Sequence, residues 1–100
     1  MGTSLDDLKG FPEEARRDAG FSLSKVQSGQ DPVHYKPMPS IGAGVTEIKI
    51  KDEGNEYRVM YVANRPSAIY VLHSFQKKTQ RTSKKDIDLT KARLKEVPNE

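Results

Sequence analysis

Cysteine is absent from this sequence of 100 residues. Its absence excludes disulfide bonds, thiolate metal sites and cysteine nucleophiles, and it is compatible with a reducing compartment. The sequence also lacks an apolar stretch of the kind that a signal peptide or a membrane span requires. We therefore expect a cytoplasmic protein with no membrane-bound part.

Apolar and aromatic residues are few, at 34% and 7% of the chain. A chain of this length forms one domain, which we take to span residues 1–100, and it buries a smaller share of its surface than a larger domain does. We therefore expect a small core, to which a partner or a second copy commonly adds stability.

Positive charge is in excess and is concentrated near the C-terminus. Lys+Arg is 17 and Asp+Glu is 14, which gives a net charge of +3. From Gln76 to Lys95 the acidic residues are Asp86 and Asp88, and the basic residues are Lys77, Lys78, Arg81, Lys84, Lys85, Lys91, Arg93 and Lys95. Such clustering is typical of proteins that bind a polyanion. A merely solvated helix face has the same composition, so charge alone leaves both interpretations open.

The N-terminal segment has the pattern of two consecutive helices. Ser4 is a suitable N-cap for the first, and Pro12 is suited to the start of the second. Apolar residues then recur at helical spacing up to Val26, and Gly29 ends the segment. The following stretch, Gln30 to Gly44, is rich in proline and glycine and is predicted to be irregular.

Alternating polarity next predicts a three-stranded antiparallel sheet. Its strands are Val45 to Ile50, Tyr57 to Ala63 and Ala68 to Phe75, and a hairpin turn at Asp52 to Asn55 joins the first two. A basic C-terminal helix follows from Ser83, its predicted cap, to Glu96. Its apolar stripe consists of Ile87, Thr90 or Lys91, and Leu94. The order of elements predicts an α+β fold.

Three cationic or titratable side chains are predicted to share this sheet. Lys49 and Arg58 lie opposite each other across the first hairpin, His73 lies on the third strand, and Lys77 follows just beyond it. Cleavage of RNA by its own 2′-hydroxyl needs a base, cations that stabilise the pentacoordinate phosphate, and an acid for the leaving oxygen. The alternative is that Lys49 and Arg58 lie on a solvated sheet face and that His73 is a hydrogen-bonded strand residue.

The two histidines and the aromatic residues of the strands are the other candidate functional residues. His34 and His73 do not stand at metal-ligand spacing, so we predict neither a metal site nor a cofactor. The side chains of Tyr57, Tyr61, Tyr70 and Phe75 are able to stack on nucleobases. Aromatic residues on strands are more often part of the core, and we expect this of most of them.

The C-terminal part of the chain, from Tyr57 to Glu96, resembles a phage-associated branch of the HigB-type toxins in the RelE/ParE superfamily. The matching residues are Tyr57, Arg58, Val59 and Tyr61 on one strand, Leu72, His73, Phe75, Lys77 and Lys78 at the end of the next, and Asp86, Ile87, Ala92, Arg93 and Leu94 in the helix. The segment from Ser4 to Pro32 resembles the family's helical N-terminus, and Lys36-Pro37 resembles its next loop.

This resemblance implies a RelE-like fold and the toxin of a type II toxin–antitoxin system. Such toxins cleave mRNA, usually on the ribosome, without a metal or cofactor, and a helix-turn-helix antitoxin encoded by an adjacent gene holds them inactive. The resemblance implies catalytic roles for Lys49, Arg58, His73 and Lys77. RNA-binding roles fall to Lys78, Arg81, Lys84 and Lys85.

The sequence departs from the family pattern in two places. No tyrosine, phenylalanine or histidine follows Phe75, although many members carry an aromatic or histidine near the C-terminus. The usual N-terminal strand also has no counterpart, which predicts an open sheet edge and a homodimer through it. Two alternative functions remain: a ParE-like toxin that inhibits gyrase without catalysis, and an inactive phage remnant that only binds its antitoxin.

Overall fold

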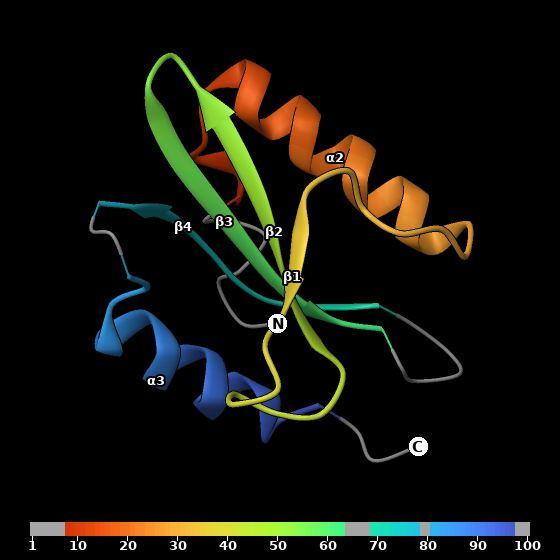
Figure 1. Ribbon diagram of the computed structural model, residues 1–100, viewed down its shortest axis with the longest axis vertical. Coiled ribbons are helices and arrows are strands. Elements are labelled where there is room, and N and C mark those ends of the chain that lie inside the picture. The colour runs from red at the N-terminus through yellow and green to blue at the C-terminus, as the bar shows by residue number, and fades with distance from the viewer. Residues whose placement is uncertain (1–7, 64–68, 79–80, 98–100) are drawn as a thin grey trace.

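The computed structural model describes residues 8–63, 69–78 and 81–97, and in these residues the protein forms three layers (Figure 1). The middle layer is a four-stranded antiparallel sheet in the order β1-β2-β3-β4. Helix α2 covers one face of the sheet and helix α3 covers the other (Figure 1). The elements are α2 (Glu13–Gln27), β1 (Tyr35–Pro37), β2 (Val45–Asp52), β3 (Asn55–Val62), β4 (Tyr70–Lys77) and α3 (Lys84–Leu94).

Helix α2 begins and ends as its sequence predicts. Pro12 is the N-cap, and its carbonyl accepts the first helical hydrogen bond, from the amide of Arg16 at 2.8 Å. Gly29 has a φ of 81°, which glycine adopts without steric cost, and the amide of Gln30 closes the helix on the carbonyl of Lys25 at 2.9 Å. Its small buried side chains, Ala15 and Ala19, bring the helix close to the sheet.

The β2–β3 hairpin fixes the register of the whole sheet. Asp52 pairs with Asn55, so the turn consists of two residues, Glu53 and Gly54. Both have positive φ, 49° and 82°, which is the geometry of the type I′ turn and suits the twist of the two strands. The predicted hairpin is therefore confirmed.

Apolar residues fill both sides of the sheet, but unequally. The α2 side contains a continuous apolar cluster of Phe11, Ala15, Ala19, Ile48, Ile50, Tyr57, Val59 and Tyr61. The α3 side contains a second cluster of Ile41, Val45, Met60, Val62, Leu72, Phe75 and Val97. Tyr57, Tyr61 and Phe75 are thus core residues, as expected, and Thr90 rather than Lys91 is the buried member of the α3 stripe.

The sheet differs from the sequence prediction in the number of its strands. The stretch predicted to be irregular contains β1, which pairs with Thr46 to Ile48 of β2. The local sequence, which ends in Pro37, does not predict a strand. The strand forms because its backbone pairs with β2. The edge expected to be open is therefore partly covered, and a homodimer through that edge stays a prediction.

The third predicted strand ends two residues later than expected, so Lys77 belongs to β4 and does not follow it. Of the predicted first helix only the end is described, with Leu8 and Lys9 in helical conformation, and the rest lies outside the described residues. The same holds for the expectation about an N-terminal strand.

Candidate functional site

Four cationic side chains lie on the α3 side of the sheet, in two neighbouring rows, and we call them the cationic face: Lys49, Lys51, Arg58 and Lys77. In the first row Lys49, Arg58 and Phe75 are cross-strand partners on β2, β3 and β4. In the second row Lys51, Glu56 and Lys77 are partners in the same way. The predicted pairing of Lys49 with Arg58 is confirmed, and the sheet brings Lys77 to the same face.

Sequence reasoning missed Lys51 and Glu56, although a signal for both was present. Each lies two residues from a predicted site residue on the same strand, and residues at that spacing share a face. Lys49 and Lys51 are exposed and Lys77 is half-buried. The two rows therefore present accessible amines around a central arginine.

Arg58 itself is buried, with 3% of its surface exposed, so the interpretation that it occupies a solvated face is wrong. Its Nη1 donates to the carbonyl of Tyr57 at 3.1 Å, and its Nη2 donates to Oε1 of Glu56 at 3.1 Å. Its Nε lies 3.4 Å from Oε1 of Glu47 without forming a hydrogen bond. Two carboxylates thus flank the guanidinium and compensate its charge.

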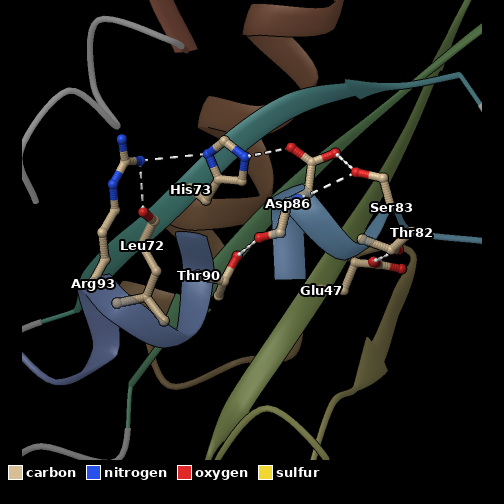
Figure 2. Close-up of polar contacts among 8 residues, drawn as sticks. All are labelled: Glu47, Leu72, His73, Thr82, Ser83, Asp86, Thr90 and Arg93. Carbon is tan, nitrogen blue, oxygen red and sulfur yellow. Dashed lines mark hydrogen bonds and ion pairs between the residues drawn. The ribbon is translucent and has the colours of Figure 1, made fainter. Parts of the chain in front are cut away.

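Glu47 is the buried partner in this arrangement, with 2% of its surface exposed. Its second oxygen, Oε2, accepts a hydrogen bond from the hydroxyl of Thr82 at 3.1 Å. Thr82 lies in the segment between β4 and α3, so this hydrogen bond connects that segment to β2 (Figure 2). Glu47 lies two residues before Lys49 on the same strand, and this spacing assigns both to one face but does not indicate that Glu47 is buried.

His73 is also buried, with 6% exposed, and both of its ring nitrogens have contacts (Figure 2). Nε2 lies 2.8 Å from Oδ1 of Asp86, and Nδ1 lies 3.4 Å from Nη1 of Arg93. A neutral ring with its proton on Nε2 satisfies both contacts, because it donates to the carboxylate and accepts from the guanidinium. The ring also stacks on Phe75, with 4.7 Å between centroids.

Asp86 links this histidine to the start of α3 (Figure 2). Its Oδ2 accepts from the hydroxyl of Ser83 at 2.7 Å, and its amide donates to the same hydroxyl at 3.2 Å. Ser83 is therefore the N-cap that the sequence predicted. We call Glu47, Arg58, His73 and Asp86 the polar layer, since these residues lie between the sheet and α3.

The predicted RNA-binding residues are exposed and follow directly on the cationic face. Lys78 comes after the last residue of β4, Arg81 lies in the connection, and Lys84 and Lys85 lie in the first turn of α3. Positive charge in the first turn of a helix is unfavourable, because the helix dipole is positive there. Helix stability therefore does not account for these two lysines.

A cavity of about 870 Å³ adjoins the cationic face. Its lining residues come from α2, the segment before β1, β2 and β3, namely Asp18, Phe21, Ser22, Val33, His34, Lys49, Ile50, Lys51, Glu56 and Arg58. Phe21 and Val33 are large apolar side chains that are exposed here. The cavity thus combines cationic and apolar side chains.

The charges of the cationic face act on Glu56. The hydrogen bond from Arg58 lowers the pKa of Glu56, and the charges of Arg58, Lys51 and Lys77 lower it further. Partial desolvation opposes this effect. The position of this carboxylate therefore favours a negative charge.

Within residues 8–63, 69–78 and 81–97 no three histidine, aspartate or glutamate side chains come together as a metal site would require. No helix in the same part of the chain is long and apolar enough to cross a membrane.

The sequence profile of the family described as phage-derived protein Gp49-like matches residues 6–95. This chain belongs to the phage-derived Gp49-like family. That family is of the RelE/HigB toxin type, which supports the resemblance at the level of the family. No curated protein and no solved structure matches the chain.

Proposed function

We propose that this protein is the toxin of a type II toxin–antitoxin system and that it cleaves mRNA on the ribosome without a metal or cofactor. Family membership supports the first part of this proposal. The observation that carries the second part is the cationic face, in which Lys49, Lys51 and Lys77 surround Arg58 on three adjacent strands. A toxin that binds only a protein has no need of such converging cations.

The proposed reaction uses the ribose of the RNA as its nucleophile. A base removes the proton of the 2′-hydroxyl, the 2′-oxygen bonds to phosphorus, and the bond from phosphorus to the 5′-oxygen breaks. An acid returns a proton to that 5′-oxygen, which leaves a 2′,3′-cyclic phosphate and a 5′-hydroxyl. Cations around the phosphate stabilise the negative charge of the transition state.

We assign the contacts with the reacting phosphate to Lys49 and Lys77, which lie on the two strands that flank the strand of the buried arginine. Of these two side chains, one accepts the proton of the 2′-hydroxyl as a neutral amine and the other donates a proton to the 5′-oxygen as an ammonium group, since both ring nitrogens of His73 have intramolecular contacts. His73 is then a positioning residue that fixes α3 against β4. Lys78, Arg81, Lys84 and Lys85 bind the RNA backbone beyond the cleavage site.

A helix-turn-helix antitoxin encoded by the adjacent gene is the proposed partner that holds the toxin inactive. The test is expression of the protein in bacteria without any partner, with growth, protein synthesis and plasmid supercoiling followed together. We expect growth and translation to stop while supercoiling stays normal. Lys49→Gln and Lys77→Gln should relieve the arrest, whereas Lys9→Gln, an exposed lysine on the N-terminal segment, should not.

Other outcomes of the same experiment identify the other functions. Altered supercoiling with intact mRNA would establish a gyrase inhibitor instead. Normal growth at a verified level of folded protein would establish an inactive remnant.

A further inference from the structure

The carboxylate of Glu56 belongs to the second row of the cationic face, between Lys51 and Lys77. Lys51 and Lys77 are its cross-strand partners on either side, and such partners have Cβ atoms about 5 Å apart. Arg58 lies two residues further along β3 and donates to Glu56 at 3.1 Å. Three cations therefore surround one carboxylate.

The partners of Arg58 differ in how firmly the fold holds them. Nη1 binds a carbonyl within β3, and Nε faces Glu47, which is buried. Nη2 binds Glu56, whose side chain is 42% exposed. Glu56 is thus the partner that an incoming group is able to displace by a change of rotamer.

The surroundings of this carboxylate also suit a phosphate group. Lys51, Glu56 and Arg58 line the cavity, and Lys77 lies outside that lining as the partner of Glu56 on β4. The lowered pKa of Glu56 shows that this position favours an anion. Guanidinium groups bind phosphate oxygens through charge-assisted hydrogen bonds, and lysines add point charges.

We propose that Arg58, Lys51 and Lys77 form a phosphate subsite and that Glu56 occupies it until a phosphate of the RNA backbone displaces the carboxylate from Nη2. The identity of the ligand as RNA rests on the proposed function, whereas the subsite itself is defined by its affinity for phosphate. Glu56 then limits the affinity of the free protein for anions. Because Glu56 occupies Nη2 of Arg58, only a ligand that also binds the surrounding lysines displaces it and binds Arg58.

The test compares Glu56→Gln with Glu53→Gln, which removes the same charge from an exposed residue of the neighbouring turn. The probes are inorganic phosphate and a short 2′-O-methyl RNA, which has no free 2′-hydroxyl and is not cleaved. Glu56→Gln should bind both about fivefold more tightly, the factor that the strongest exposed ion pairs reach. Glu53→Gln should change the affinity by less than about twofold, since it acts only through screened long-range charge.

A second measurement locates the phosphate without any substitution. Phosphate added to the wild-type protein should shift the NMR resonances of the Arg58 guanidinium and of the Glu56 carboxyl carbon, with Lys51→Gln weakening both titrations. Equal affinities in the two variants, or resonances of Arg58 that do not respond, would overturn the subsite.

These outcomes are separate from those of the proposed function, because neither probe is cleaved. If only Glu56→Gln binds the probes more tightly and the wild-type protein leaves mRNA intact, the phosphate subsite is supported and the endonuclease activity is contradicted. If the protein cleaves mRNA but Glu56→Gln binds the probes no more tightly, only the phosphate subsite is contradicted.

Discussion

At the scale of single residues, contacts within the hairpin were predictable and contacts between distant segments were not. The pairing of Lys49 with Arg58 follows from the two-residue turn, which sets the register of both strands. Arg58 is buried beside Glu47, and Glu47 in turn accepts a hydrogen bond from Thr82, which is 35 residues away in the sequence. Alternation of polar and apolar residues assigns a side chain to a face but does not indicate what covers that face.

Burial of Arg58 predicts a large loss of stability on its removal. Arg58→Met should lower the free energy of unfolding by about 3–5 kcal/mol, because it leaves the buried carboxylate of Glu47 uncompensated. Urea unfolding followed by circular dichroism measures the change. Lys49→Met, on the exposed cross-strand partner, should cost at most about 0.5 kcal/mol.

The double variant Glu47→Gln/Arg58→Met separates this explanation from simple loss of packing. It should be more stable than Arg58→Met alone, because no unpaired carboxylate remains in it. A double variant as unstable as the sum of both single variants would contradict a charge-compensated pair.

The contacts of His73 predict a positioning role for it. His73→Gln should lower stability by about 1–3 kcal/mol, since it disturbs the hydrogen bond to Asp86. Cleavage per folded molecule should fall by less than the factor of about 10² to 10⁴ that is typical for loss of a proton-transfer group. The pH dependence of the remaining cleavage should keep its shape, and loss of one of its limbs would instead make His73 a general acid or base.

At the scale of elements, the sequence predicted α2, the hairpin and the cap of α3, because each depends on local signals. Proline and glycine bound α2, and Ser83 stands before the first turn of α3. Strand β1 was missed because its residues have no alternating pattern and it exists only through pairing with β2. The end of β4 was placed too early because Gln76 and Lys77 are polar, although both pair with β3.

The cap of α3 should contribute measurably to stability. Ser83→Ala should lower the free energy of unfolding by about 1 kcal/mol, the usual effect of removing an N-cap hydroxyl. Ser24→Ala is the matched control, since Ser24 is exposed inside α2, where alanine is the better helix former. An equal effect of both substitutions in thermal melts would show that Ser83 does not cap the helix.

The lysines in the first turn of α3 should reduce stability while increasing affinity for RNA. Lys84→Glu and Lys85→Glu should each raise the free energy of unfolding by about 0.3–1 kcal/mol, through a better interaction with the helix dipole. Each should also reduce the slope of log affinity against log salt by about 0.7 for single-stranded RNA. Lys91→Glu, near the other end of α3, makes the same charge change and should lower stability.

At the scale of the whole molecule, the sequence predicted the class of the fold and the order of its main elements. It did not predict how the two faces of the sheet differ in polarity. The α2 side is apolar throughout, whereas the α3 side combines an apolar cluster with the polar layer and the cationic face. Which charged residues the α3 side buries and which it exposes depends on where α3 and its approach lie. The positions of α3 and Thr82 depend on tertiary packing, and no local sequence pattern predicts them.

The proposed function therefore requires that the exposed lysines of the cationic face act on RNA. The most direct test maps the 5′ ends of cellular mRNA shortly after expression of the wild-type protein, of Lys49→Gln/Lys77→Gln and of Lys9→Gln. We predict new 5′-hydroxyl ends within translated codons for the wild type and Lys9→Gln, and a reduction of at least about 10² for the double variant. Intact mRNA with growth arrested, or the same ends produced by the double variant, would contradict the proposal that the cationic face cleaves RNA.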